Sequence, residues 1–292
     1  MAQEFENLAL EGGGVWGIAY AGALEELDKI GVLPQIKRVA GTSAGSITAL
    51  LLALGYSSAE IYKVFSELDY TRFQDHRSIN QLLTKYGLYD CQYGLKLFQG
   101  WVAEKLGTED ATFQDLHAAG GLDLRVYATN LNSRQIHEFS YAKTQDVPLA
   151  SAVRASISVP LYFTAVEVGG HLFVDGGAVF DYPMMGFGKG ELLNTLGLAF
   201  ASSSAVATAD PEDDSFGYRQ PIQYIHRMVT VLERSQSPVL ALHEELQNLT
   251  IWIDTGSVTS LNFSLTPEDR NFLIESGRKA VREYFKVEET KS

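Results

Sequence analysis

The sequence is short of cysteine, of long apolar runs and of basic residues. Its 292 residues include one cysteine, Cys91, which excludes an internal disulfide framework and a cysteine-rich metal site. The longest apolar stretch, residues 47–54, is far shorter than the about 20 residues that a membrane-spanning helix needs. With 23 Lys and Arg against 36 Asp and Glu, the formal net charge is −13. This charge argues against nucleic acid as a partner and against electrostatic attraction to an anionic membrane.

The rest of the composition is that of a folded globular chain. Hydrophobic residues make up 46% and charged residues 20%, which argues against disorder. We see no repeat, linker or clear boundary, so we predict a single domain over residues 1–292. The first six residues are acidic, unlike a secretory signal. The cytoplasm is therefore the simplest compartment, with export by a signal-independent route left open, and the oligomeric state is also left open.

Short apolar segments alternate with helical patterns along the chain. The predicted strands are residues 7–10, 36–40, 124–129, 136–140, 165–168, 172–174 and 249–253. The predicted helices are residues 15–29, 44–54, 92–106, 148–155 and 221–248, one that begins at a capping box at Ser57, and one that begins at Thr266. A polar loop is predicted at residues 201–217. This alternation predicts an α/β fold with a mostly parallel sheet covered on both faces.

The segment Gly41-Thr42-Ser43-Ala44-Gly45 matches the pattern G-x-S-x-G between a predicted strand and a predicted helix. At a sharp strand-to-helix turn this pattern exposes the serine hydroxyl, and small neighbours avoid clashes with the strained backbone. The N-terminus of the helix favours negative charge that develops beside it. We therefore interpret Ser43 as a candidate nucleophile. A glycine-rich turn in which the serine only caps the helix is the alternative.

A second glycine-rich turn, Gly12-Gly13-Gly14-Val15-Trp16-Gly17, also lies between a strand and a helix. Backbone N–H groups at such a turn can bind an anion. A dinucleotide-binding loop would need an acidic residue at the end of the second strand, and none is present there. A phosphate-binding P-loop would need Gly-Lys-Ser/Thr, and Ile18 follows Gly17. We favour an oxyanion hole for an intermediate formed at Ser43 over the dinucleotide loop.

A serine nucleophile needs a base within hydrogen-bond reach. None of the six histidines lies in a loop after a late strand, where a hydrolase triad would place one; they are His76, His117, His137, His171, His226 and His243. A carboxylate bonded directly to the serine is the other possibility. Asp175, at the end of an apolar strand and before Gly176-Gly177, is the candidate base. An ordinary hairpin-turn aspartate is the alternative interpretation.

Together these segments resemble the patatin-like phospholipases. The first glycine-rich turn matches the family's oxyanion block, and the segment around Ser43 matches its nucleophile elbow. Residues 154–160 look like its Ala-Ser-x-x-x-Pro block, and Asp175-Gly176-Gly177 looks like its Asp-Gly-Gly/Ala block. The resemblance extends from about residue 7 to residue 284.

The resemblance implies a three-layer α/β/α sandwich and a Ser–Asp dyad in place of a triad. Ser43 is then the nucleophile, and Asp175 orients and deprotonates it. The oxyanion loop is then formed by Gly12, Gly13, Gly14 and Gly17. Donation to the oxyanion is expected from the Gly13 and Gly14 amides. The resemblance implies no metal and no organic cofactor.

Two positions depart from the family pattern. Trp16 stands where the family usually has Arg or Lys, which leaves the head-group preference open and makes Trp16 a candidate wall of the substrate channel. Asp181-Tyr182-Pro183 stands where the family often has Asn-x-Pro. We expect this second change to alter a loop contact rather than the chemistry.

The expected function is a lipid acyl hydrolase of phospholipase A or lysophospholipase type. Its partner is a lipid substrate, reached through a brief apolar contact with a membrane or micelle. The aromatic residues within 70–101 would either cover an acyl channel or, as we prefer, pack an ordinary core. The alternatives are an esterase or thioesterase for short soluble acyl groups and a non-catalytic nucleotide- or anion-binding module.

Overall fold

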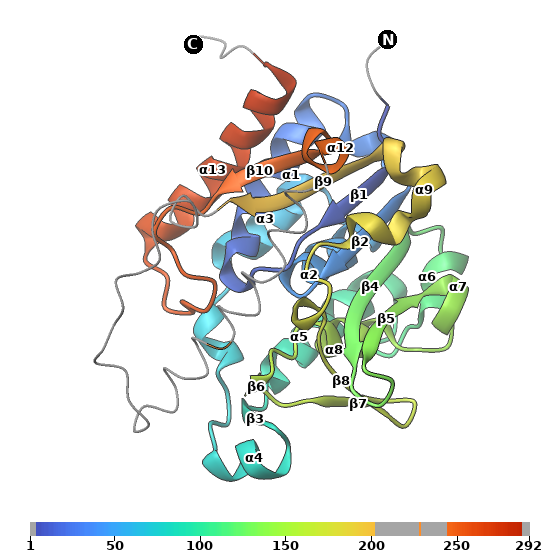
Figure 1. Cartoon of the computed structure of the whole chain (residues 1–292), viewed down its shortest axis with the longest axis vertical. Coiled ribbons are helices and arrows are strands. Elements are labelled where there is room, and N and C mark those ends of the chain that lie inside the picture. Colours follow the sequence, from blue (N-terminus) through green and yellow to red (C-terminus); the bar gives the residue numbers. More distant parts are fainter. Residues whose placement is uncertain (1–3, 202–227, 229–243, 288–292) are drawn as a thin grey trace.

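A mixed sheet lies at the centre of the computed structural model, which describes residues 4–201, 228 and 244–287 (Figure 1). The strands are β1 (Asn7–Leu10), β2 (Arg38–Thr42), β3 (Gly87–Tyr89), β4 (Asp123–Asn130), β5 (Gln135–Ser140), β6 (Leu161–Phe163), β7 (Val166–Val168), β8 (His171–Asp175), β9 (Thr195–Ala201) and β10 (Thr250–Asp254). Eight of them form the main sheet in the order β10-β9-β1-β2-β4-β8-β7, with β5 also paired to β4. The five strands β10, β9, β1, β2 and β4 run parallel, whereas β5 and β8 pair antiparallel with β4.

Helices and short 3-10 segments cover both faces of this sheet. The helices are α1 (Ala19–Lys29), α2 (Ala44–Ala53), α3 (Ser58–Glu67), α4 (Ile79–Thr84), α5 (Gln92–Leu106), α6 (Phe113–Ala118), α7 (Tyr141–Thr144), α8 (Leu149–Ser156), α9 (Gly188–Glu191), α12 (Glu244–Asn248) and α13 (Pro267–Phe285). The 3-10 segments are η1 (Gly14–Ile18), η2 (Leu33–Gln35), η3 (Tyr70–Phe73), η4 (Gly176–Ala178), η5 (Pro183–Phe187) and η6 (Leu192–Asn194). The elements α4, β3 and β6 lie together at one end of the molecule (Figure 1).

Two neighbouring residues of β2 show how the layers are arranged. Gly41 faces α2, because a β-carbon there would lie 2.3 Å from the carbonyl oxygen of Gly45. Thr42 faces the other way, and its hydroxyl donates to the carbonyl oxygen of Phe180 at 3.1 Å. Helix α2 packs on β1, β2 and β4, whereas η5 packs on β1, β2 and β9. The arrangement confirms the predicted three-layer α/β/α fold.

Helices α1 and α13 approach closely through two glycines. A β-carbon on Gly22 would lie 2.0 Å from the carbonyl oxygen of Ile274, and one on Gly277 would lie 2.0 Å from that of Ala19. Helix α13 also packs on β10. The last helix therefore lies against the helix that follows the first glycine-rich turn.

Several predicted elements are confirmed within one or two residues. They include β1, the β7–β8 hairpin around Gly169 and Gly170, the capping box at Ser57, and the start of the last helix at Thr266. Strand β2 runs two residues further than predicted, to Thr42, so the strand leads directly into Ser43. The helix predicted from residue 15 begins as η1 and becomes α-helical only at Ala19.

Strand β9 was not predicted; it pairs with β1 and with β10, which is the edge strand on that side of the sheet. The loop predicted at residues 201–217 lies outside the described residues after Ala201. The helix predicted at residues 221–248 also lies largely outside the described residues. Its last five residues form α12. Among the described residues, no helix is both long enough and apolar enough to span a bilayer.

Candidate active site

Ser43 occupies a strained junction between β2 and α2. Its backbone angles are φ 48° and ψ −123°, a region that side-chain-bearing residues rarely adopt. The Ser43 side chain makes no capping hydrogen bond to α2. Its Oγ instead donates to Oδ2 of Asp175 at 2.7 Å, and both side chains are buried. The interpretation of Ser43 as a simple helix cap is therefore wrong.

The two glycines of the G-x-S-x-G segment are required by close backbone contacts. A β-carbon on Gly45 would lie 2.2 Å from the carbonyl oxygen of Leu10, just as one on Gly41 would meet Gly45. The backbone of Ser43 is held by two further serines. Its N–H donates to Oγ of Ser156 at 2.9 Å, and its carbonyl accepts from Oγ of Ser46 at 2.6 Å. These contacts fix the orientation of the Ser43 hydroxyl.

Asp175, the last residue of β8, is hydrogen-bonded through both carboxyl oxygens. Oδ2 accepts from Ser43, and Oδ1 accepts from the N–H of Gly177 at 2.7 Å. Burial, with a smaller contribution from the nearby Asp181 carboxyl, raises the pKa of Asp175 to about 7. The hydrogen bonds from Ser43 and Gly177 favour the ionised form and act in the opposite direction. The result is a carboxyl whose basicity is closer to that of histidine than to that of an exposed aspartate.

The backbone of Asp175 is anchored from both sides. Its N–H donates to the carbonyl of Ser158 at 2.8 Å, and its carbonyl accepts from the hydroxyl of Thr129 at 2.9 Å. Arg154, which is buried, donates to Oγ of Ser158 at 2.6 Å and to the carbonyl of Asp90 at 2.8 Å. Sequence reasoning did not assign these roles, although Arg154 and Ser158 lie in the segment that resembles the family's Ala-Ser-x-x-x-Pro block.

The first glycine-rich turn lies beside the dyad. Gly13 and Gly14 have positive φ angles of 150° and 56°, and both line a cavity together with Ser43 and Asp175. The N–H of Gly12 is already used, since it donates to the carbonyl of Asp181 at 3.0 Å. Gly17 lies inside η1, where a β-carbon would be 3.1 Å from that of Ala44. Gly12 and Gly17 thus shape the turn, while Gly13 and Gly14 face the cavity.

Two small cavities meet at Ser43. The polar one is lined by Gly13, Ser43, Asp175, Gly177 and Asp181, among others. The apolar one is lined by Ser43, Ile47, Tyr70, Phe73, Phe163 and Phe263, among others. Ser43 therefore lies where a cavity that contains both dyad residues meets an apolar one.

The aromatic residues within 70–101 differ in their surroundings. Phe98 and Trp101 are buried in the core, as an ordinary packing role requires. Tyr70 and Phe73 stack with ring centroids 6.2 Å apart and line the apolar cavity at Ser43. Tyr86 is exposed.

Trp16 and the four histidines that the structure describes are not among the residues that line these cavities. Trp16 lines neither cavity; its indole N–H donates to the carbonyl of Val258 at 2.8 Å, and its ring packs on Phe200. Of the histidines that the structure describes, none lines either cavity. The other two, His226 and His243, lie outside the described residues.

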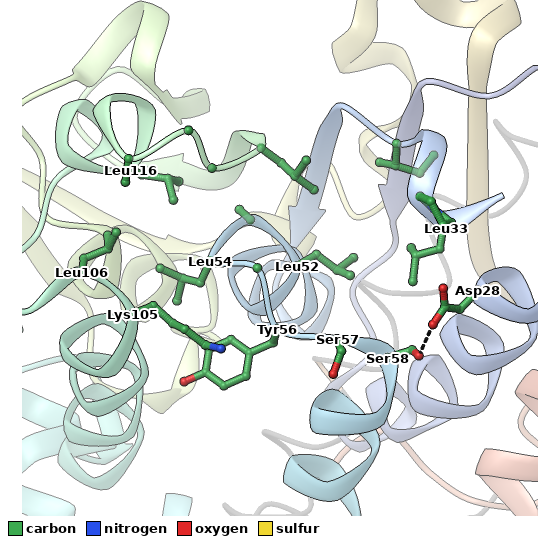
Figure 2. A pocket seen from close by; sticks show the side chains of 18 residues that line it. Asp28, Leu33, Leu52, Leu54, Tyr56, Ser57, Ser58, Lys105, Leu106 and Leu116 are labelled. Carbon is green, nitrogen blue, oxygen red and sulfur yellow. Dashed lines mark hydrogen bonds between the residues drawn. The ribbon is translucent and has the colours of Figure 1, made fainter. Parts of the chain in front are cut away.

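A larger hollow of 490 Å³ lies at the opposite end of α2 (Figure 2). Leu52, Leu54 and Tyr56 line it, as do Lys105 and Leu116 from other helices (Figure 2). Because α2 has ten residues, its two ends are roughly 15 Å apart. None of the predicted site residues lines this hollow. In the described part of the chain, no group of three or more His, Cys, Asp and Glu side chains is arranged to hold a metal ion.

Comparisons with known proteins identify the family and the fold of this chain. The sequence profile described as patatin-like phospholipase matches residues 8–187. An uncharacterized protein of Acanthamoeba polyphaga mimivirus is 31% identical, over 96% of this chain and 93% of its own length. A probable lipid hydrolase of Invertebrate iridescent virus 6 is 26% identical, over 62% of each chain. VipD from Legionella pneumophila superposes with a TM-score of 0.65 at 20% identity, over 97% of this chain and 67% of VipD.

The profile matches more than half of the chain, and the similarity to the mimivirus protein covers nearly all of it. Together they identify the family to which this chain belongs. The chain belongs to the patatin-like phospholipase family. At 20% identity, the likeness to VipD concerns the fold alone.

Proposed function

We propose that this chain is a lipid acyl hydrolase of phospholipase A or lysophospholipase type, working as one catalytic domain through Ser43 and Asp175. The observation that carries the proposal is the 2.7 Å hydrogen bond from Ser43 Oγ to Asp175 Oδ2 at a strained strand-to-helix turn. A serine hydroxyl bonded to a buried carboxylate has the base within reach that an acyl-transfer nucleophile needs.

In the first half of the reaction, Ser43 Oγ attacks the ester carbonyl carbon. The Oγ–H bond breaks as its proton passes to Asp175 Oδ2, the Oγ–C bond forms, and the carbonyl electron pair becomes an oxyanion. Collapse of this intermediate breaks the bond to the alcohol oxygen, which takes the proton from Asp175. In the second half, water attacks the acyl-enzyme, gives a proton to Asp175, and the fatty acid leaves as Ser43 Oγ regains that proton.

Electrostatics around the dyad support both proton transfer and charge development. A carboxyl whose pKa is raised by burial to about 7 accepts a proton more readily at neutral pH than an exposed aspartate does. The Gly13 and Gly14 amides are proposed to donate to the oxyanion, next to the N-terminus of α2. One such donor contributes about 10²–10³-fold to kcat in other serine hydrolases.

The apolar cavity supports a hydrocarbon chain as the acyl part of the substrate. Its walls include Ile47, Phe163 and Phe263, which offer no charge to bind a short polar acyl group. We therefore expect rates to rise with acyl chain length, and contact with a membrane or micelle to be brief and apolar because the net charge is −13. An esterase or thioesterase for short soluble acyl groups would show the opposite dependence on chain length.

The decisive experiment is fatty-acid release from a panel of phosphatidylcholine, lysophosphatidylcholine, triacylglycerol and short-chain esters. Wild type should release fatty acid from the first two, and Ser43→Ala should release none. Ser133→Ala, at an exposed turn position, is the matched control and should behave as wild type. Activity that survives in folded Ser43→Ala would contradict the proposal.

Covalent labelling separates the enzyme from a non-catalytic binding module. A fluorophosphonate should label wild type at Ser43 and leave Ser43→Ala unlabelled. Absence of labelling together with tight binding of a nucleotide or an anion would favour the binding module. Single substitution of each histidine should leave hydrolysis within a few-fold, since the proposal gives none of them a role.

A further inference from the structure

The most exposed large apolar side chains of the described residues lie close together, on and just after α4. Leu83 is 76% exposed, Ile79 is 71% exposed, and Tyr86, two residues beyond the helix, is 57% exposed. We call these three residues the α4 tip. Residues four apart share one face of a helix, so Ile79 and Leu83 form one apolar surface, and no residue of α4 is buried. Apolar side chains gathered on an exposed surface are typical of an interaction site.

The α4 tip is joined directly to the walls of the apolar cavity in the candidate active site. Phe73, which lines that cavity, lies in η3, the element before α4. After α4 the chain continues as β3, which pairs with β6 at the same end of the molecule (Figure 1). In this pair Tyr89 lies opposite Phe163, another wall of the cavity, and the carbonyl of Lys85 accepts from the N–H of Ala165 at 3.2 Å. A lipid that met the α4 tip would therefore lie next to the elements that surround the acyl cavity.

The charge of this segment is opposite in sign to that of the whole chain. Residues 76–89 include Arg77 and Lys85 but no aspartate or glutamate, although the chain has 36 acidic residues. Both basic side chains are exposed and flank α4 in the sequence, and Lys85 also pairs with Asp90 at 3.4 Å. Basic side chains beside an apolar surface suit the phosphate groups of phospholipids, and tyrosine is favoured at the boundary between headgroups and acyl chains. This chemistry fits a phospholipid surface.

From this juxtaposition we propose that the protein docks on phospholipid bilayers through the α4 tip, which enters the interface while Arg77 and Lys85 meet the phosphate groups. The inference rests on the proposed function, since a lipid acyl hydrolase must take its substrate from such a surface. The net charge of −13 does not prevent this docking, because charges more than about 8 Å from the bilayer are largely screened at physiological salt.

Docking is tested without catalysis, in the Ser43→Ala background, by co-sedimentation with phosphatidylcholine vesicles. Glutamine is polar and a good helix former, so Ile79→Gln combined with Leu83→Gln removes the apolar surface and keeps α4. The partition coefficient of this double variant should fall at least about tenfold, because two apolar side chains no longer enter the interface. Leu193→Gln is the matched control and should bind like its parent. Leu193 is 65% exposed in η6, which precedes β9 at the edge of the sheet opposite to Ser43.

A labelled cysteine shows which surface enters the lipid. Cys91 is buried, and burial raises the pKa of its thiol to about 11, so a maleimide dye should react with an introduced cysteine alone. An environment-sensitive dye on Leu83→Cys should brighten and shift to the blue when vesicles are added, and the same dye on Leu193→Cys should not change. Phosphatidylglycerol in the vesicles should tighten binding, because the basic residues beside the α4 tip meet its charge directly.

Hydrolysis separates this inference from the proposed function. With Ser43 intact, the double variant should lose about tenfold in rate on phosphatidylcholine vesicles, in line with its weaker binding. It should keep the wild-type rate on a short-chain phosphatidylcholine present as monomers, since neither residue lines the cavities at Ser43. If no lipid is hydrolysed while the vesicle results are as expected, the proposed function fails and the docking surface stands.

Four outcomes would overturn the inference. They are vesicle binding that the double variant leaves unchanged, a dye on Leu83→Cys that vesicles do not affect, binding that phosphatidylglycerol weakens, and an absence of vesicle binding by the parent Ser43→Ala. The last outcome would assign the α4 tip to a protein partner.

Discussion

Two serines stand at the N-termini of consecutive helices, and their surroundings are opposite. Ser57, before α3, has an extended backbone and forms a capping box in which its side chain accepts from the N–H of Glu60. Ser43, before α2, has a positive φ and makes no capping bond. One carboxylate, Glu60, is exposed and has its pKa lowered to about 2 by hydrogen bonds from Ser57, whereas the other, Asp175, is buried and has its pKa raised to about 7.

The local interactions at Ser57 stabilise the fold, whereas those at Ser43 favour the proposed chemistry over stability. At Ser57 every local interaction favours the folded helix. At Ser43 the backbone strain and the buried carboxyl oppose folding, and the surrounding contacts from Ser156, Ser158 and Arg154 hold them in place. We therefore expect substitutions at the two sites to affect activity and stability in opposite ways.

The largest expected effect is on activity at the Ser43 site. Asp175→Asn keeps the size of the side chain and removes the base, so kcat should fall about 10⁴-fold, as it does when a triad loses its carboxylate. Rates of fatty-acid release measure this change. Asp146→Asn, at an exposed position, is the control, and an equal loss of kcat in that variant would contradict a specific role for Asp175.

A pair of helical glycines tests the close packing of the strained turn. Gly45→Ala, in α2, should lower the free energy of unfolding by about 1–3 kcal/mol, because its β-carbon would meet the carbonyl of Leu10. Gly100→Ala, in α5, should raise it by about 0.5–1 kcal/mol, because nothing lies within 4 Å of the new methyl group. Urea unfolding followed by circular dichroism gives both values, and a stabilising Gly45→Ala would contradict the described geometry.

The buried carboxyl should make stability depend on pH. Folding raises the pKa of Asp175 from 3.8 to about 7. The contribution of this carboxyl to the free energy of unfolding is therefore fully present below about pH 4 and is lost as the pH rises through 7. Asp175→Asn cannot ionise at this position, so its free energy of unfolding should gain roughly 4 kcal/mol relative to wild type between pH 4 and pH 8. Thermal melts across this range measure the gain. A constant difference between the two proteins would show that Asp175 is ionised throughout.

The smallest expected effect is at the conventional cap. Ser57→Ala should lower the free energy of unfolding by about 1 kcal/mol and leave kcat unchanged, since it removes an exposed capping bond far from the dyad. Ser43→Gly provides the counterpart: it should abolish hydrolysis while relieving the positive φ of a non-glycine residue. If the free energy of unfolding of Ser43→Gly were much lower than that of Ser57→Ala, the result would contradict the claim that the backbone of Ser43 is strained.

Local patterns predicted the elements that carry the dyad. Glycine placement and capping chemistry act between near neighbours in sequence. They predict the junctions at Gly12–Gly17 and Gly41–Gly45, the hairpin that ends at Asp175, the capping box at Ser57 and the helix start at Thr266. Strand β9 was missed because its seven-residue apolar run is buried on both faces and has no period that separates it from a buried helix.

The supporting residues required the tertiary structure. Arg154 looks like a surface cation of an amphipathic helix, and its burial depends on carbonyl groups of Asp90 and Thr164 that are distant in sequence. Asp181 was expected to change only a loop contact. The structure instead brings its carboxyl against Gly12 and Gly177, because β1 and the residues after β8 meet at one edge of the sheet.

The glycine contact between α1 and α13 ties the end of the chain to its beginning. Helix α1 continues directly from η1, so whatever steadies α1 also steadies the amides of Gly13 and Gly14. A protein that ends before Pro267 would lack α13, which packs on both α1 and β10. The apolar face of α1 would then be exposed, although both dyad residues would remain. Minimal versions of this hydrolase should therefore be designed to retain the C-terminal helix, and affinity tags should be placed beyond it.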